Sequence, residues 1–279
     1  MPEVVWGDGL VAGLNRNINL KQKKHMGLLD RFFGSGSNKE KKKIRAQFKN
    51  EKYFKKEIKR CDEWMNNDKE DFEKYIKKHG KLMDIHYVNA CKIRLQKIEN
   101  MYSVGESPVK LKDSYKEVLD YFLKGYSENY KDNLLALEIV SFCKLLNFNQ
   151  KELNKIIDFI NKWENNSKIK DIYKPCSLLY YLLDKEVIKR KSYKPIEELY
   201  QITQQPKSEA EISIKKYLDN WYSMHKDEPW YNSHLRDSGY SGYWAWEVAA
   251  VVKVKGLDDT GFKDNPYYPY DMVHWEDKK

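Results

Sequence analysis

The sequence has few of the residues that interrupt helices, and it lacks the spacings that hold metal ions. Only eight prolines and 13 glycines occur among 279 residues, which leaves long uninterrupted segments that suit helices. The six histidines are scattered, so we predict no zinc site, no other metal and no cofactor. The four cysteines are far apart, form no CxxC pair and lie in apolar or helical contexts: Cys61, Cys91, Cys143 and Cys176. We therefore predict buried free thiols in a reducing compartment.

Further absences bear on location and activity. No run approaches the roughly 18 apolar residues that span a bilayer, and the N-terminus lacks a secretory pattern. We therefore expect no transmembrane segment and a cytoplasmic protein. The sequence has no glycine-rich phosphate loop, no GxSxG elbow and no HExxH motif. A hydrolytic site is conceivable from Glu247, Asp258, Asp259, Asp271 and His234. Each of these residues also has a structural explanation, so we predict that the protein is not an enzyme.

Charge is divided unevenly along the chain. Residues 1–194 hold 41 Lys and Arg against 27 Asp and Glu, a net charge of +14, whereas residues 195–279 hold 10 against 15, a net charge of −5. Basic clusters at 39–45 and 55–60 could contact nucleic-acid phosphates. Acidic residues interleave with these clusters, so we interpret them as solvated helix faces and expect no direct nucleic-acid contact. Nucleic-acid binding by the basic half is kept as the alternative function.

Apolar spacing predicts an all-α fold, a bundle of antiparallel helices in two packed parts. From residue 39 onward, apolar residues recur at helical intervals and are separated by short polar connections. We expect a poorly ordered extension over 1–38, a helical N-terminal domain over 39–165 and a helical C-terminal domain over 170–279.

Local signals locate several helix starts. Asn149 with Glu152, and Ser208 with Glu211, resemble capping boxes, in which the first residue precedes the helix and the second lies in its first turn. Pro195 suits the first turn of another helix because its fixed φ is already helical. Each of these signals predicts a helix that begins at that point.

The stretch from Gly239 to Asp271 is the densest in aromatic, glycine and acidic residues. Residues 243–255 are apolar on every side, which predicts a buried helix capped by Ser241 and followed by Gly256. Glu247 would then be desolvated, which is costly unless hydrogen bonds or a cation compensate. One interpretation is a network that holds the last segment against this helix: Tyr243, Trp244, Glu247, Tyr268, Pro269 and Asp271. In it, tyrosines or His274 would donate to Glu247. The other interpretation is a direct functional role for Glu247.

The acidic residues that follow also admit two interpretations. Asp258 or Asp259 can cap a short turn that ends at Gly261, and Asp271 can cap a last turn of helix. The same carboxylates could instead form an acidic face. The sequence leaves both open.

These motifs together resemble one family, the PoNi-type immunity proteins. The resemblance rests on an ordered series of segments: Trp221-Tyr222-Ser223-Met224-His225, Pro229-Trp230-Tyr231-Asn232-Ser233-His234, Gly242-Tyr243-Trp244-Ala245-Trp246-Glu247, Asp258-Asp259 and Tyr267-Tyr268-Pro269-Tyr270-Asp271. Its specificity lies in residues 217–275. The region of about 39–162 resembles the family's helical N-terminal domain more weakly, and residues 1–38 lie outside it.

The resemblance implies a bacterial cytoplasmic antitoxin without catalytic activity. Family members neutralise PoNe-type toxins, DNases of the PD-(D/E)xK kind delivered by contact-dependent secretion systems, so the expected partner is a cognate nuclease toxin. Since a DNase groove must be basic, an acidic patch with aromatic residues would suit its inhibitor. We expect the exposed members of one set to contact the toxin: Asp227, Glu228, Trp230, Tyr231, Asp237, Asp258, Asp259 and Asp264. The alternative is that these aromatics are core and these acids are caps.

Overall fold

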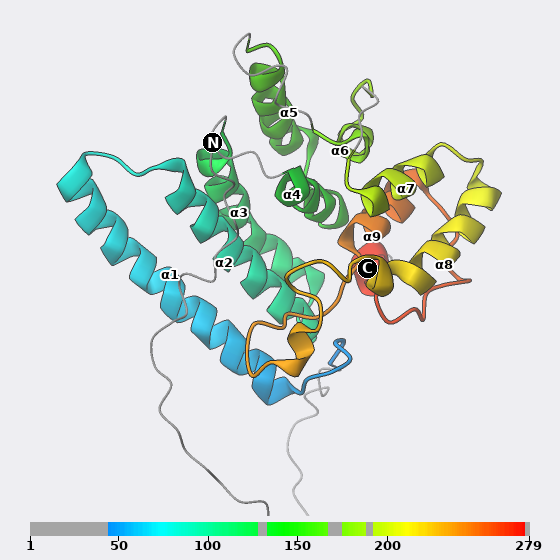
Figure 1. Cartoon of the computed structure of the whole chain (residues 1–279), viewed down its shortest axis with the longest axis horizontal. Helices are drawn as coiled ribbons and strands as arrows, with labels where there is room; N and C mark the ends of the chain where they lie inside the picture. The colour runs from blue at the N-terminus through cyan, green and yellow to red at the C-terminus, as the bar shows by residue number, and fades with distance from the viewer. Residues whose placement is uncertain (1–43, 128–132, 167–174, 188–191, 277–279) are drawn as a thin grey trace, which may run out of the picture. The chain divides into compact units, whose positions relative to one another are not determined.

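The computed structural model describes residues 44–127, 133–166, 175–187 and 192–276 (Figure 1). The predicted extension over 1–38 lies outside these ranges. Within them the chain forms ten α-helices and one 3-10 helix with no strand, which confirms the all-α prediction. In these same ranges, we find no helix with both the length and the apolar character needed to cross a bilayer.

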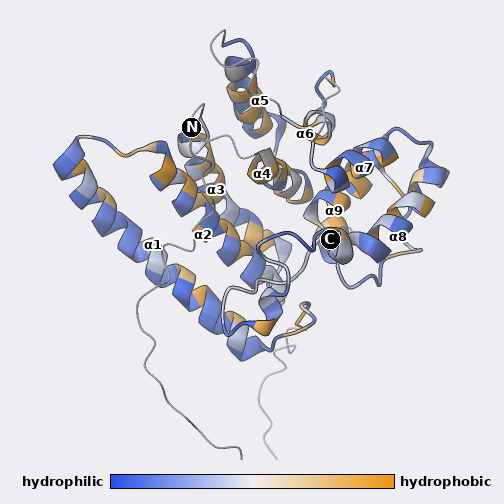
Figure 2. Ribbon diagram, viewed as in Figure 1, coloured by the Kyte–Doolittle hydropathy of each residue, from blue (hydrophilic) through white to orange (hydrophobic). Residues whose placement is uncertain are grey.

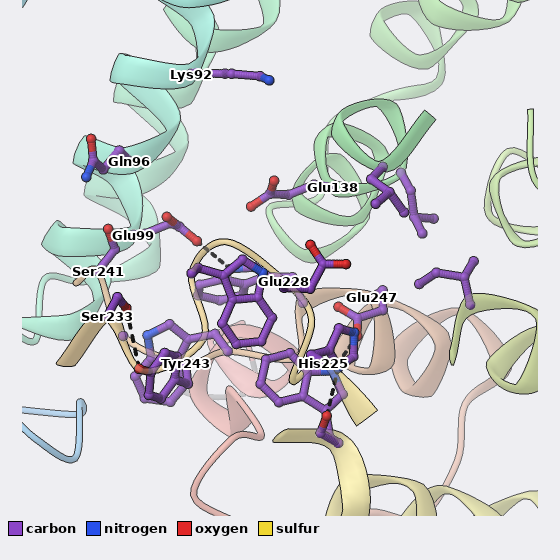
Figure 3. A pocket seen from close by; sticks show the side chains of 18 of the residues that line it. Lys92, Gln96, Glu99, Glu138, His225, Glu228, Ser233, Ser241, Tyr243 and Glu247 are labelled. Carbon is purple, nitrogen blue, oxygen red and sulfur yellow. Dashed lines mark hydrogen bonds between the residues drawn. The ribbon is translucent and has the colours of Figure 1, made fainter. Parts of the chain in front are cut away.

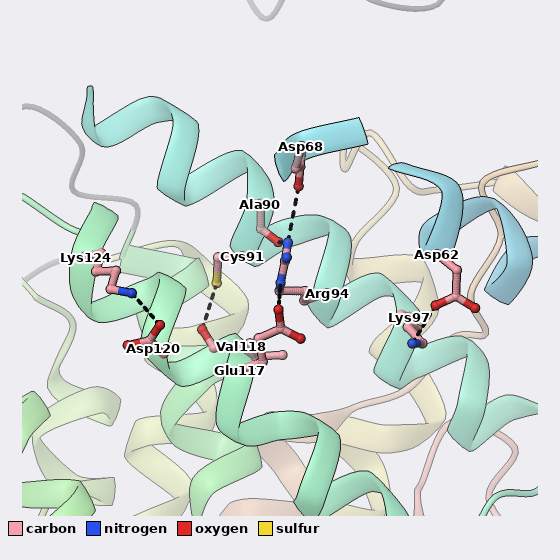
Figure 4. Close-up of polar contacts among 10 residues, drawn as sticks. All are labelled: Asp62, Asp68, Ala90, Cys91, Arg94, Lys97, Glu117, Val118, Asp120 and Lys124. Carbon is pink, nitrogen blue, oxygen red and sulfur yellow. Dashed lines mark hydrogen bonds and ion pairs between the residues drawn. The ribbon is translucent and has the colours of Figure 1, made fainter. Parts of the chain in front are cut away.

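The first three helices form a layer with α2 at its centre. α1 (Glu51–His79) and α3 (Pro108–Gly125) pack on either side of α2 (Asp84–Ser103). Figure 4 shows how polar contacts join the three helices. Arg94 of α2 is 2% exposed, and its guanidinium reaches Asp68 of α1 at 3.2 Å and Glu117 of α3 at 2.9 Å. A buried guanidinium with a carboxylate on each side fixes the layer, because removing either partner would leave the cation uncompensated.

The middle of the chain forms α4 (Asn133–Leu145), α5 (Gln150–Glu164), α6 (Ser177–Leu182), α7 (Lys194–Thr203) and α8 (Lys207–Met224). The capping box before α5 is confirmed: the Asn149 N–H donates to Glu152 at 3.0 Å, and the Glu152 N–H donates to Asn149 Oδ1 at 3.1 Å. Pro195 lies in the first turn of α7, as predicted. The box at Ser208 is wrong, because α8 begins at Lys207 and Glu211 instead accepts the Asp258 N–H at 2.9 Å.

The last part of the chain surrounds α9 (Trp246–Lys255), which is buried on most of its sides, as predicted. Its apolar side chains meet α4, α6, α7, α8 and α10 (Tyr270–His274), and Figure 2 shows hydrophobic colour on α4 and α9. Gly256 ends α9 in the left-handed region at φ 62°. The predicted start is wrong: Ser241 does not cap the helix, which begins only at Trp246.

A single hydrophobic core contains side chains from both sides of residues 165–170, where we placed the domain boundary. The contact between α4 and α9 is the main one that crosses it. All four cysteines are free and buried, which confirms that they are buried thiols. The two halves of the described chain are therefore joined by apolar packing as well as by sequence.

Candidate functional site

A cavity of about 410 Å³ lies where the two halves meet, and we call it the acidic cavity (Figure 3). Its wall comes from α2, α4, the end of α8, the connection between α8 and α9, and the start of α9. The ionisable side chains in this wall are Lys92, Glu99, Glu138, Tyr193, His225, Glu228, Tyr243 and Glu247. Four carboxylates against a single lysine make the wall acidic, although the half that supplies Glu99 and Glu138 is basic overall.

Two of these carboxylates are each held by a tryptophan. The Trp221 indole donates Nε1–H to Glu247 Oε1 at 2.7 Å, and the Trp246 indole donates to Glu99 Oε1 at 3.1 Å. The tyrosine donors that we predicted for Glu247 are therefore wrong, because α8 brings an indole to that position. Burial raises the pKa of Glu99 to about 7 and also raises the pKa of Glu247. Nearby His225 and the indole hydrogen bonds oppose the shift at Glu247.

His225 is an enclosed ionisable residue of the wall. Its side chain belongs to a residue that is 6% exposed, and its Nδ1 lies 2.7 Å from the Trp221 carbonyl oxygen. A carbonyl can only accept, so Nδ1 carries a proton, and Nε2 is an acceptor whenever the ring is neutral. Among the described residues, none makes a hydrogen bond to that Nε2. The wall therefore presents acceptors at Glu99, Glu247 and His225.

Aromatic rings supply the rest of the wall. Trp221 and Trp230 stack with ring centroids 5.4 Å apart, and Trp244 and Trp246 complete the lining around them. Outside the cavity the Tyr222 and Tyr231 rings also stack, with their ring centroids 4.4 Å apart. These aromatic contacts fix the faces that the cavity presents.

The connection that carries Trp230 is anchored to the first helices. The Gly239 N–H donates to Glu57 of α1 at 3.0 Å, and the Ser103 hydroxyl of α2 donates to the Ser241 carbonyl. Gly242 has φ 104°, a conformation that favours glycine. The cavity thus depends on contacts between residues more than a hundred positions apart.

A second anchor lies at the edge of the same connection. The Tyr243 hydroxyl lies 2.8 Å from His234 Nδ1 and also accepts the His234 N–H at 3.1 Å. The His234 ring stacks on Phe48 at 4.3 Å, and Leu235 beside it is 73% exposed. This edge combines a fixed aromatic pair with an exposed leucine.

Other members of the predicted network have separate partners. Trp244 Nε1–H donates to Ser103 at 2.9 Å, and Asp271 forms an ion pair with Arg45 at 2.7 Å. Pro269 is buried and immediately precedes α10. The conceivable hydrolytic group is therefore not assembled, because Glu247, Asp271 and His234 each face a different partner. No group of three or more His, Cys, Asp or Glu in the described ranges is arranged for a metal ion.

One predicted contact residue, Asp259, is not exposed. It is 4% exposed, and its Oδ2 accepts the Tyr268 hydroxyl at 2.7 Å and lies 2.7 Å from His274 Nε2. A charge reversal at Asp259 should therefore disturb the fold, because the carboxylate holds two side chains of the last segment. Tyr268 belongs to the predicted structural network, and its partner is Asp259.

The remaining predicted contact residues fall on two connections. Glu228 and Trp230 line the acidic cavity, and Asp227, Tyr231 and Asp237 lie on the same connection, with both aspartates exposed. Asp258 and Asp264 are exposed on the connection after α9 and do not line the cavity. The Asp258 side chain accepts the Thr260 N–H at 3.0 Å, which gives it the capping role in a turn.

Sequence reasoning missed Glu99, Glu138 and His225. Glu99 and Glu138 lie on helices whose pattern explains them as ordinary polar positions, and His225 directly follows α8. The approach of all three to Glu247 depends on how the helices pack. The only signal was the aromatic density after Trp221, which marked one side of the cavity and not the other.

Comparisons with known proteins identify both halves of the chain. A model described as "PoNe immunity protein (PoNi), N-terminal" matches residues 38–158, and one described as "PoNe immunity proteins (PoNi), C-terminal" matches residues 176–272. No curated protein has a matching sequence. Among solved structures, the crystal structure of protein PA2201 from Pseudomonas aeruginosa is similar, with a TM-score of 0.56 and 16% identity. The likeness covers 84% of this chain and 91% of that one, and it shows a shared fold.

Proposed function

This chain belongs to the family of PoNe immunity proteins, and we propose that it binds and neutralises a cognate PoNe-type DNase toxin in the bacterial cytoplasm. The observation that carries the proposal is the match of both family models, in order, over most of the chain. In such a pair the immunity protein protects the producing cell and its kin during competition through contact-dependent secretion. The protein acts by binding and carries no catalytic activity of its own.

The charge distribution supports this proposal. A nuclease groove is basic because it holds phosphates, and an acidic inhibitor surface speeds association with a basic partner. Asp227, Glu228 and Asp237 lie beside Trp230 and Tyr231 on one connection, which pairs acidic groups with the aromatic types that dominate binding hot spots. We propose that this connection contacts the toxin, with Asp258 and Asp264 at the margin.

We also propose that residues 39–165 and 170–279 act as one binding unit. α4 of the first part packs against α9 of the second, and the acidic cavity takes its carboxylates from both. A toxin that binds at this junction would contact both parts at once.

The alternative, nucleic-acid binding by the basic half, has weaker support. Several lysines of α1 are paired along the helix with acids one turn away, such as Lys55 with Glu51 at 2.5 Å and Lys59 with Glu63 at 3.7 Å. Such pairs reduce the positive field that phosphates would meet.

Rescue tests the proposal directly. The nuclease encoded beside this gene is expressed with and without this protein, and survival is followed together with intact chromosomal DNA. We expect protection and co-purification of the pair. Neither protection nor a complex would contradict the proposal, and a shift of bare DNA in a gel would then favour the alternative.

A further inference from the structure

We propose that the acidic cavity receives an arginine side chain of the nuclease toxin, so that the guanidinium lies between Glu99 and Glu247 against the tryptophan rings. This inference rests on the proposed function for the identity of the partner. The kind of group that the cavity binds is argued below from its own chemistry.

The first argument is that these carboxylates have no lysine or arginine partner. Glu99 accepts from the Trp246 indole and the Ser241 side chain, and Glu247 accepts from the Trp221 indole and lies near His225. In the described ranges no lysine or arginine forms an ion pair with either carboxylate or with Glu228. A carboxylate removed from water is costly unless a cation or several donors compensate. A cation that enters the cavity would therefore gain from both carboxylates at once.

The second argument is the enclosed acceptor at His225. Its Nδ1–H is committed to the Trp221 carbonyl oxygen, so the Nε2 of this 6% exposed residue accepts from a ligand when the ring is neutral. A ligand for this wall must therefore bring several N–H donors. A carboxylate or phosphate ligand would meet Glu99, Glu228 and Glu247 and would be repelled.

The third argument separates arginine from lysine. A guanidinium is flat, carries five N–H donors in a fixed arrangement and stacks on aromatic faces, whereas an ammonium is a compact and strongly hydrated charge. The rings of Trp221 and Trp230, which stack on each other, line the cavity together with the carboxylates. The volume of about 410 Å³ falls in the range of roughly 300–1,000 Å³ that is usual for ligand pockets.

Position favours an arginine of a protein over a free cation. The exposed residues Asp227 and Asp237 lie on the connection that supplies Glu228 and Trp230 to the cavity. A basic toxin surface attracted to this connection would bring its arginines to the cavity. The buried acceptors would then fix the register of the complex, while the exposed acids accelerate encounter.

Binding to the toxin provides the first test. The affinity of a catalytically inactive form of the adjacent-gene nuclease is measured for wild type, Glu99→Gln and Glu247→Gln. Glutamine keeps an oxygen that can accept the indole N–H, and it removes the charge and turns the other oxygen into an NH2 donor. We expect each variant to bind about 30-fold more weakly or worse, mainly through faster dissociation. Glu70→Gln is the control, since this α1 side chain is 78% exposed and should bind as wild type does.

A titration of the protein alone provides the second test. N-acetyl-arginine methylamide is added to wild-type protein while the indole N–H signals of Trp221 and Trp246 are followed by NMR. We expect both signals to shift saturably, and the neutral citrulline analogue to leave them unmoved.

The two tests separate the two proposals. Unchanged affinity in both glutamine variants would overturn the cavity proposal and leave the immunity function intact. If wild type does not bind the nuclease, the proposed function fails and the titration alone decides whether the cavity takes a guanidinium. Indole signals that ignore the arginine probe would then overturn it.

Discussion

Two connections flank α9, and they use the same kinds of residue differently. The first, residues 225–245, keeps Asp227 and Asp237 exposed and turns Glu228 toward the acidic cavity. The second, residues 256–269, buries Asp259 beneath Tyr268 and His274. Acidic and aromatic residues are dense in both, so composition does not separate a binding segment from a structural one. The two kinds of segment are distinguished by where each acidic side chain lies and which residues it contacts.

The backbones of the two connections differ in the same way. The first is tied to α1 and α2 through Gly239 and Ser241. The second is bonded partly to itself, with the Phe262 N–H donating to the Asp259 carbonyl and the Tyr267 N–H donating to the Asn265 side chain, each at 3.0 Å. It is also bonded to α8, where Glu211 accepts the Asp258 N–H at 2.9 Å. Damage to the first should therefore loosen the junction of the two halves, whereas damage to the second should act locally.

The largest expected effect comes from a matched pair of glycines. A Cβ at Gly242, in the first connection, would overlap the Trp244 indole and the Ser103 hydroxyl, at φ 104°. We expect Gly242→Ala to reduce the free energy of unfolding by about 3 kcal/mol, through strain and the loss of the Trp244–Ser103 hydrogen bond. Gly261→Ala in the second connection meets open space and should change stability by less than about 0.5 kcal/mol. Chemical denaturation measures both, and equal stabilities would contradict the difference.

The next effect tests the buried acid of the second connection. Asp259→Ala removes the acceptor shared by Tyr268 and His274, and we expect a loss of about 2 kcal/mol in the free energy of unfolding. Asp258→Ala, which alters only an exposed turn, should change thermal unfolding little. If the two alanine variants unfold alike, Asp259 does not have the structural role that its contacts indicate.

A third effect has the opposite sign and concerns the acidic cavity. Burial raises the pKa of Glu99 from its ordinary value of 4.5 to about 7. Below pH 4.5 the carboxyl group is neutral in the folded and the unfolded protein, so its burial does not reduce stability. The folded protein loses stability as the pH rises through 7, because the buried group must then ionise. Glu99→Gln removes this loss and should stabilise the free protein by about 1–2 kcal/mol at pH 8 and hardly at all at pH 4.5.

Denaturation at pH 4.5, 6 and 8 measures this difference. The groups that face Glu99 across the cavity are Lys92, Glu138, His225, Glu228 and Glu247, and they remain in both proteins. A gap between variant and wild type that does not grow with pH would show that Glu99 is not desolvated. If Glu99→Gln is more stable than wild type but binds the nuclease less tightly, Glu99 serves binding at a cost in stability.

The smallest effect concerns the exposed acids. Charge reversal of Asp227 with Asp237 should slow association with the nuclease several-fold at low salt and leave dissociation nearly unchanged, because exposed charges act mainly through long-range attraction. Reversal of Asp258 with Asp264 should have a smaller effect if the first connection faces the toxin. Stopped-flow association at two salt concentrations checks this, and a larger effect from the second pair would move the interface to the other connection.

Local signals in the sequence were reliable where they concerned neighbours along the chain. The capping box of Asn149 and Glu152, the proline start of α7 and the Gly256 end of α9 all depend on contacts within about four residues. The box at Ser208 failed because Glu211 is bonded by Asp258, 47 residues away. The tyrosine partner predicted for Glu247 failed in the same way, because Trp221 comes from another helix.

Only the wall of the acidic cavity that the C-terminal part supplies could be predicted from the sequence. The sequence marked Glu228, Trp230 and Glu247 through the density of aromatic and acidic residues near them. Nothing marked Glu99, and His225 stood in a motif segment without an assigned role. Their role depends on the packing of α2 and α8 around α9, and no spacing along the chain encodes that distance.

By itself, the sequence determined the helical class, the free thiols and the family, because these depend on periodicity, separation and ordered motifs. Only the tertiary structure decided which acids remain in water and which enter the core or the acidic cavity. The physical reason is that the cost of burying a carboxylate depends on the donors around it. For Glu99, Glu247 and Asp259 those donors come from elsewhere in the fold or from a later turn of the chain.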